Sequence, residues 1–159
     1  MAARHWFYER NEQGDGKQPL TLGSVMTKKV RTLAPEALVM DAMQLIREHG
    51  VRHIPIVDDA NGKLVGLVTE TDILKNVLHG KSMTSDERYH ATLDMLLPLR
   101  EVMVTPVQAM RPEANVEKAI ALFLKKKIRC VPVSDSKGRL LGIVTQTDLL
   151  RLLEHVVEG

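Results

Sequence analysis

The sequence predicts an α/β protein built from two copies of one unit, each with the order strand, helix, strand, strand, helix. The first observation is a repeat at an offset of 77 residues, which aligns Val25-Met26-Thr27 with Val102-Met103-Val104. The second is local: each copy has one stretch with apolar residues at helical spacing and two short stretches rich in β-branched residues. Because such self-similarity is typical of repeat architectures, both copies are expected to have the same fold.

The alignment continues along both copies. Ile54-Pro55-Ile56 aligns with Val131-Pro132-Val133 at the same offset. After one deletion in the second copy, residues 63–69 align with residues 139–145. Agreement over two long stretches indicates a duplication.

The first predicted helix of each copy has one apolar face, because its apolar residues recur at i, i+3, i+4 and i+7. A short strand, Val30 to Leu33, precedes the first of these helices, and Gly50 is expected to end it as a C-cap glycine. The apolar positions are Val39, Ala42, Met43 and Ile46 in the first copy, and Val116, Ala119, Ile120 and Phe123 in the second.

A β-hairpin and a second helix complete each copy. Strands are predicted over Ile54 to Val57 and Leu64 to Val68, and Asn61-Gly62 between them is a strong hairpin signal. Ser136-Lys137-Gly138 has the same role in the second copy. Neither copy can cover its helical faces alone, so the two are expected to pack about a pseudo-twofold axis. The last helices are expected to bury Ile73, Leu74 and Val77, and Leu149, Leu150 and Leu153.

Four segments are predicted along the chain: an N-terminal tail (1–20), a first repeat (21–79), a helical linker (80–100) and a second repeat (101–159). In the linker, an amphipathic helix is expected to end at Pro98. The tail carries three aromatic residues, which are expected to dock on this chain or on a partner. The linker positions are Tyr89, Leu93, Leu96 and Leu97, and the tail aromatics are Trp6, Phe7 and Tyr8.

Composition limits the classes of function. The chain is 44% hydrophobic and 26% charged with a formal net charge of +2, which is ordinary for a soluble globular protein. It has no strongly basic stretch for nucleic acid, no run long enough to span a bilayer and no signal peptide, so neither nucleic acid nor membrane is expected as a partner. The single cysteine, Cys130, favours a reducing, cytoplasmic setting.

No catalytic or metal-binding pattern is evident. His49 and His53 are four residues apart, but Gly50 is expected to break the helix between them. Cys130 is expected to be a buried core residue rather than a nucleophile. Neither a glycine-rich phosphate loop nor a Ser-His-Asp arrangement is present. We therefore expect a protein that is not an enzyme and holds no metal or cofactor.

The chemistry is expected at two Thr-x-x-Asp stretches, Thr69 to Asp72 and Thr145 to Asp148. Two roles fit them. Threonine and aspartate at a helix start satisfy free backbone N–H groups, as in a capping box. A carboxylate at a strand-to-helix junction can also accept two hydrogen bonds from a ribose diol, beside a helix N-terminus that favours phosphate. The residues alone leave both roles open.

These stretches also carry a family resemblance. Gly66 to Asp72 and Gly142 to Asp148 follow the pattern Gly-h-h-Thr-x-x-Asp, where h is apolar, and an h-Pro-h strand precedes each. The arrangement resembles the CBS (cystathionine β-synthase) domain family over roughly Leu22 to Leu153. The resemblance implies one Bateman module of two CBS repeats, which binds adenosyl ligands between the repeats.

The resemblance implies two ligand sites, each drawing on both copies. The Thr-x-x-Asp of one copy would hold the ribose, the early strands of the other would enclose the base, and arginines would meet phosphate. We expect the first site to be the tighter, because a threonine there can hydrogen-bond an adenine edge where the second site has alanine. The first site comprises Thr32, Ala37, Val51, Arg52, His53, Ile54, Ile143, Thr145 and Asp148, and the second Leu67, Thr69, Asp72, Ala109, Ala114, Ile128, Arg129, Cys130 and Val131.

The predicted function is therefore regulatory. The chain is expected to bind AMP, ADP or ATP, to form a homodimer, and to signal in trans to an effector protein. S-adenosylmethionine, NAD(H) and cyclic dinucleotides contain the same adenosyl group and stay open as ligands. A ligand-free dimerisation or interaction module is the alternative function.

Overall fold

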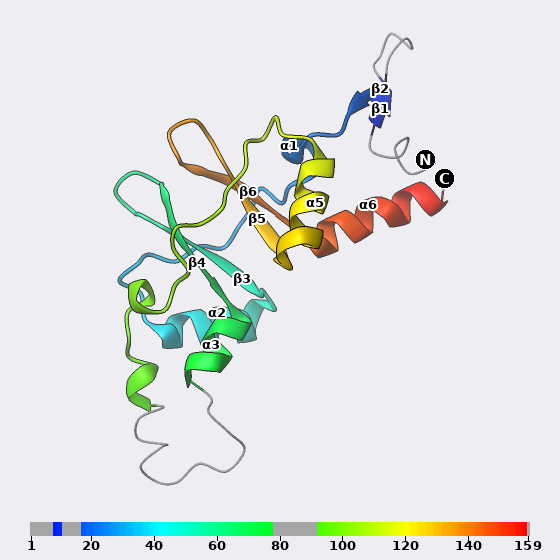
Figure 1. Ribbon diagram of the computed structural model, residues 1–159. Helices are drawn as coiled ribbons and strands as arrows, with labels where there is room; N and C mark the ends of the chain where they lie inside the picture. The colour runs from blue at the N-terminus through cyan, green and yellow to red at the C-terminus, as the bar shows by residue number, and fades with distance from the viewer. Residues whose placement is uncertain (1–7, 11–16, 78–91, 159) are drawn as a thin grey trace. The chain divides into compact units, whose positions relative to one another are not determined.

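The computed structural model describes residues 8–10, 17–77 and 92–158 of the 159-residue chain (Figure 1). Residues 92–94, in the predicted linker, are helical. The other elements are β1 (Tyr8–Arg10), β2 (Lys17–Pro19), α1 (Leu22–Val25), α2 (Val39–His49), β3 (His53–Val57), β4 (Leu64–Thr69), α3 (Glu70–Val77), the 3₁₀ helix η2 (Leu99–Glu101), α5 (Val116–Lys126), β5 (Cys130–Ser134), β6 (Leu140–Thr145) and α6 (Gln146–Glu158). The predicted order of elements in both copies is confirmed.

Packing divides the chain into two compact units that do not follow the sequence repeats. One unit joins Met1–Lys29 to Gln108–Gly159, and the other is Val30–Val107. The segment that leads into each copy therefore packs on the hairpin of the other copy. The boundaries predicted from the sequence describe the duplication, whereas these units describe which residues pack together.

In the Val30–Val107 unit, β3 and β4 form an antiparallel hairpin with a bulge at Ile56 and Val57. The strand predicted at Val30 to Leu33 is reduced to one parallel bridge between Leu33 and Ile56. The Leu33 N–H donates to the Pro55 carbonyl (3.3 Å), and the Val57 N–H donates to the Leu33 carbonyl (2.9 Å). The ladder cannot extend either way, because Pro35 and Pro55 lack the N–H groups that the next bonds need.

The second hairpin, β5 and β6, repeats this arrangement in the other unit. Its bulge falls at Val133 and Ser134. Met110 forms the equivalent parallel bridge, with its N–H on the Pro132 carbonyl (3.0 Å) and its carbonyl accepting from Ser134 (3.0 Å). Pro112 and Pro132 stop this ladder as Pro35 and Pro55 stop the first. The duplication is thus preserved down to single hydrogen bonds.

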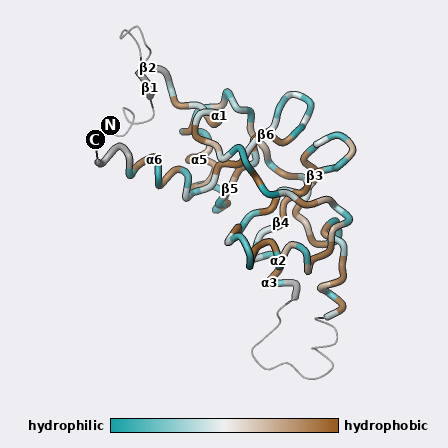
Figure 2. Tube along the Cα trace, turned by 180° about the vertical axis from the view of Figure 1, so that it is seen from behind, coloured by the Kyte–Doolittle hydropathy of each residue, from teal (hydrophilic) through white to brown (hydrophobic). Residues whose placement is uncertain are grey.

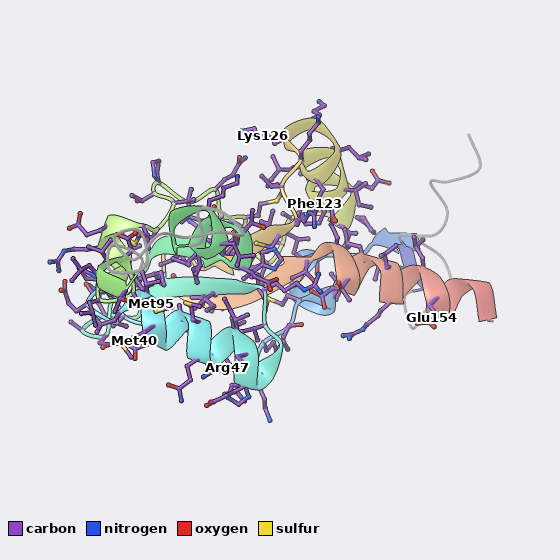
Figure 3. The ribbon with its side chains drawn as sticks, turned by 90° about the horizontal axis from the view of Figure 1, so that it is seen from below. Met40, Arg47, Met95, Phe123, Lys126 and Glu154 are labelled. Atoms are coloured by element: carbon purple, nitrogen blue, oxygen red, sulfur yellow. The ribbon has the colours of Figure 1, made fainter. Side chains whose placement is uncertain are left out.

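Helix α2 covers the first hairpin and has α3 beside it (Figure 1). The Val39 N–H at its start donates to the Leu97 carbonyl (2.9 Å), which satisfies a group that the helix itself leaves open. The helix ends at Gly50 in the left-handed conformation (φ 64°), as predicted. Figure 3 shows Met40 and Met95 at the same end of α2, where the Met40 N–H donates to the Met95 carbonyl (3.0 Å).

Each unit has its own apolar core, and Figure 2 shows hydrophobic residues along the hairpin strands. On α5, Phe123 is 6% exposed and lies in the core, whereas Lys126 lies at the exposed end (Figure 3). The core of one unit comprises Val39, Ala42, Ile54, Ile56, Val68, Ile73 and Leu99, and that of the other Leu20, Leu22, Val116, Ala119, Phe123, Val131, Val133, Val144 and Leu149.

The prediction for the last helices was only partly right. Ile73 and Leu149 are buried as expected, but Leu74 is 43% exposed, Leu150 64% and Leu153 38%. Adjacent residues point about 100° apart around a helix, and Leu74 and Leu150 point away from the cores in which Ile73 and Leu149 are buried.

Two further predictions fall partly outside the described residues. In the linker, the described leucines are exposed: Leu93, in the helix, by 43%, and Leu96 and Leu97, in the turn after it, by 52% and 36%. These leucines are therefore not buried against the described part of the chain. The side chains of Trp6, Phe7, Tyr8, Val77 and Tyr89 lie outside the described part.

Candidate ligand site

Both predicted Thr-x-x-Asp stretches lie where a hairpin strand passes into a helix, β4 into α3 and β6 into α6. Asp72 Oδ2 accepts from the Thr69 N–H (3.1 Å) and the Thr69 hydroxyl (2.6 Å), and the Asp72 N–H donates to Thr69 Oγ1 (3.2 Å). In the other copy, Asp148 Oδ2 accepts from the Thr145 N–H and hydroxyl, both at 2.8 Å, and the Asp148 N–H donates to Thr145 Oγ1 (3.2 Å). The capping role is confirmed at both junctions, and it fixes each carboxylate in place.

A third residue reaches the carboxylate of Asp148. The Thr27 hydroxyl donates to Asp148 Oδ1 at 3.2 Å. Thr27 is held there by a pair of backbone bonds to Ile143, at 2.9 and 3.0 Å. In the other copy Val104 pairs with Leu67 in the same way, at 3.1 and 2.8 Å, but valine has no hydroxyl to donate.

The glycine of each Gly-h-h-Thr-x-x-Asp stretch is needed because a methionine side chain packs directly against it. A Cβ added to Gly66 would lie 2.8 Å from Cγ of Met103, and one added to Gly142 would lie 2.6 Å from Sδ of Met26. Neither glycine has a positive φ. The sequence pattern therefore requires glycine here for space rather than for backbone conformation.

The two predicted phosphate-binding arginines are exposed but differ in their neighbours. Arg52 Nε lies 3.8 Å from a carboxylate oxygen of Glu70, in an exposed ion pair. At the equivalent place near Arg129, the second copy has Gln146, whose side chain donates to the Ile128 carbonyl (3.5 Å). Within the described part of the chain, Arg129 thus has no carboxylate competing with an anionic ligand.

The other predicted site residues divide by accessibility. Thr32 is exposed, whereas Ile54 and Val131 are fully buried in the two cores, so these two could serve a ligand only through their backbone. Cys130 is 5% exposed and Ile143 6%. Those of intermediate burial are Ala37, Val51, His53, Leu67, Ala109, Ala114 and Ile128.

Each predicted site draws its residues from both compact units. Thr145 and Asp148 belong to one unit, and Thr32 and Arg52 belong to the other. The structure fixes each carboxylate in its own unit, and the complete sites remain predictions. Among the described residues, no group of His, Cys, Asp and Glu could hold a metal ion. None of the described helices has the length and apolarity needed to cross a bilayer.

Comparison with known families decides what kind of module this is. The model of the CBS domain matches residues 22–79 and residues 99–155, more than half of the chain. The chain belongs to the CBS domain family. The two matched segments make it a CBS pair, as the duplicated signature predicted.

Solved structures of other CBS pairs have the same fold. CBSX2 of Arabidopsis thaliana, solved in complex with AMP, is 28% identical, with a TM-score of 0.70 over 86% of this chain and 97% of that one. The CBS pair of protein MJ0100, in complex with 5′-methylthioadenosine and S-adenosyl-L-methionine, is 28% identical, with a TM-score of 0.69 over 85% and 96%. A Vibrio cholerae protein that carries the name acetoin utilization protein AcuB is 31% identical, with a TM-score of 0.72 over 87% and 93%.

Two curated relatives are longer than this CBS pair. Protein MK0525 of Methanopyrus kandleri is 30% identical over 139 residues, which is 87% of this chain and 65% of that protein. Protein MJ1225 of Methanocaldococcus jannaschii is 27% identical over 136 residues, 83% of this chain and 49% of that protein. The chain thus spans about half to two thirds of these relatives.

Thr27 is the residue that the sequence analysis missed. In the alignment of Val25-Met26-Thr27 with Val102-Met103-Val104, the polar Thr27 of the first copy corresponds to the apolar Val104 of the second. That difference was a usable signal. Its partner, Asp148, is 121 residues away along the chain, so the sequence alone gave no reason to connect them.

Proposed function

We propose that this CBS pair is a regulatory module that binds an adenosyl ligand, with AMP, ADP or ATP as the favoured class. The observation that carries the proposal is the duplicated carboxylate: Asp72 and Asp148 are each held by a threonine at the first turn of a helix. A rigid carboxylate is suited to ribose hydroxyls, and the adjacent helix N-terminus favours a phosphate group. The match to the CBS domain family supports the same ligand class.

The proposed sites combine residues of both copies. In the first, Thr145 and Asp148 hold the ribose while the segment around Thr32 and the backbone of Ile54 enclose the base. In the second, Thr69 and Asp72 take the place of Thr145 and Asp148. Because the residues of each site belong to both compact units, a bound ligand would favour the arrangement of units that brings them together. The bound arrangement is the signal passed in trans to an effector protein.

The choice of ligand rests on the adenosyl group. CBSX2 was solved with AMP, and MJ0100 with 5′-methylthioadenosine and S-adenosyl-L-methionine, so both neighbours hold adenosyl compounds. Exposed arginines at positions 52 and 129 favour a ligand that also carries phosphate. S-adenosylmethionine, NAD(H) and cyclic dinucleotides are the alternative ligands.

The second candidate function is a ligand-free dimerisation module. Exposed leucines on the last helices favour it: Leu74 and Leu150 occupy equivalent positions and are 43% and 64% exposed. Apolar side chains of this size, repeated on two helices, suit a contact with a second copy of the chain. A homodimer is proposed under both functions, so ligand binding is what separates them. The buried Cys130 supports a reducing, cytoplasmic setting for either.

The test is calorimetric titration of AMP, ADP, ATP, S-adenosylmethionine, NAD(H) and a cyclic dinucleotide into three variants and the unchanged chain. Asp72→Asn and Asp148→Asn keep the shape of each carboxylate but remove its charge, and Asp59→Asn in an exposed hairpin turn is the control. A hydrogen bond to a charged group contributes about 1.5–3 kcal/mol, so each site variant should lose roughly ten- to a hundredfold in affinity at its own site.

We expect the Asp148→Asn change to remove the tighter event, because Thr32 can bond an adenine edge where Ala109 cannot. A larger loss from Asp72→Asn would reverse that ranking. Absence of binding by all six ligands, together with a dimer in analytical ultracentrifugation, would favour the ligand-free module.

A further inference from the structure

The carboxylate of Asp148 has a limited number of acceptor positions. An ionised carboxylate offers about four lone-pair positions, two on each oxygen. Asp148 Oδ2 accepts two hydrogen bonds from Thr145, at 2.8 Å each. Asp148 Oδ1 accepts a third from the Thr27 hydroxyl at 3.2 Å. One position therefore remains for a ligand hydroxyl, whereas a ribose diol offers two.

Thr27 cannot easily move away from this position. Its N–H donates to the Ile143 carbonyl at 2.9 Å, and its carbonyl accepts from the Ile143 N–H at 3.0 Å. Its neighbour Met26 packs against Gly142 of β6, so closely that position 142 has no room for a side chain. The hydroxyl is thus presented to Asp148 from a fixed backbone, and all of these contacts lie within one compact unit.

The other copy supplies the natural comparison. Val104 forms the same backbone pair with Leu67, so the fold accepts valine at this place. Valine and threonine have nearly the same shape and differ mainly in the hydroxyl. Thr27 is exposed, so exchange of its hydroxyl for a methyl group leaves no buried polar group without a partner.

We propose that Thr27 is a specificity-determining residue of the Asp148 site, which restricts this carboxylate to one ribose hydroxyl. The proposal rests on the proposed function, because it assumes that Asp148 receives the ribose of an adenosyl ligand. Thr27 acts as an internal substitute for the second hydroxyl. The Asp148 site should then tolerate an adenosyl ligand that lacks one of its two ribose hydroxyls but not one that lacks the other.

The experiment measures hydroxyl dependence by calorimetry. AMP, 2′-deoxy-AMP and 3′-deoxy-AMP are titrated into 159-residue chains that all carry Asp72→Asn, so that the Asp148 site is observed alone. The chains have threonine, valine (Thr27→Val) or serine (Thr27→Ser) at position 27. Serine retains the hydroxyl and is the matched control. Thermal melting of each chain, expected to be unchanged, shows that the variants are folded.

With threonine or serine, one deoxy analogue should bind within about twofold of AMP and the other roughly tenfold more weakly, as expected for one lost bond to a carboxylate. With valine, both analogues should bind roughly tenfold more weakly than AMP, and AMP itself should bind more tightly. If AMP binds and the analogue ratios are the same for all three residues, this proposal is wrong while the proposed function stands. If neither AMP nor any of the other five ligands binds the chains or the unchanged protein, both fail.

Discussion

The close approach at the two signature glycines gives the sharpest stability prediction. At Gly142 an added Cβ would lie 2.8 Å from the Thr27 backbone carbonyl as well as 2.6 Å from Met26 Sδ. At Gly66 the near atoms all belong to the Met103 side chain. Because a methionine side chain can rotate and a paired backbone cannot, Gly142→Ala should destabilise the protein more than Gly66→Ala.

The magnitudes follow from the contacts. Overpacking lowers the free energy of unfolding by about 1–3 kcal/mol. Alanine in place of glycine offsets about 0.4–1 kcal/mol of this loss, because it lowers the conformational entropy of the unfolded chain. Gly66→Ala should therefore cost about 1–2 kcal/mol. Gly142→Ala should also strain the two backbone bonds between Thr27 and Ile143, each with a net value of about 0.5–1.5 kcal/mol. Its total should be about 2–4 kcal/mol.

Urea denaturation of the two variants measures these free energies, and a double-mutant cycle identifies their source. When Met103 is already alanine, Gly66→Ala should cost little further stability, whereas Gly142→Ala should keep most of its cost when Met26 is alanine. Equal stability of the two glycine variants, or no remaining cost of Gly142→Ala when Met26 is alanine, would refute the argument from backbone contact.

Three further predictions test single residues. Glu70→Gln frees Arg52 from an exposed ion pair, so the affinity for AMP relative to adenosine should rise by roughly two- to fivefold in calorimetry. The pKa of Asp135 is lowered from 3.8, chiefly by the Arg139 backbone N–H. Its contribution to stability is therefore present above pH 4 and falls on acidification. Asp135→Asn should lower the urea midpoint at pH 6, and the difference should shrink as the pH is lowered below 4. Lys127 ends α5 with a φ of 53°, where the first copy has glycine. Lys127→Gly should therefore raise the melting temperature slightly, by relieving about 1 kcal/mol of backbone strain; an unchanged or lower value contradicts this.

The elements and the duplication could be predicted from the amino-acid sequence, because they depend on residues close together in the chain. Apolar spacing located α2 and α5, Asn61-Gly62 located the first hairpin, and Gly50 located a helix end. The Thr-x-x-Asp spacing likewise predicted the capping at Asp72 and Asp148, since the bonded groups are three residues apart.

Which segments pack together could not be predicted from local pattern and was learned from the folded chain. Periodicity shows that a helix has an apolar face but not how wide the covered stripe is, and so Leu74 and Leu150 were wrongly expected to be buried. The segment before each copy packs on the hairpin of the other copy, which brings Thr27 to Asp148. This packing depends on contacts between residues far apart in the chain. In a duplicated sequence the hairpins of both copies offer nearly the same backbone groups to such a segment. The local pattern therefore does not predict which hairpin the segment pairs with, because that depends on packing across the chain.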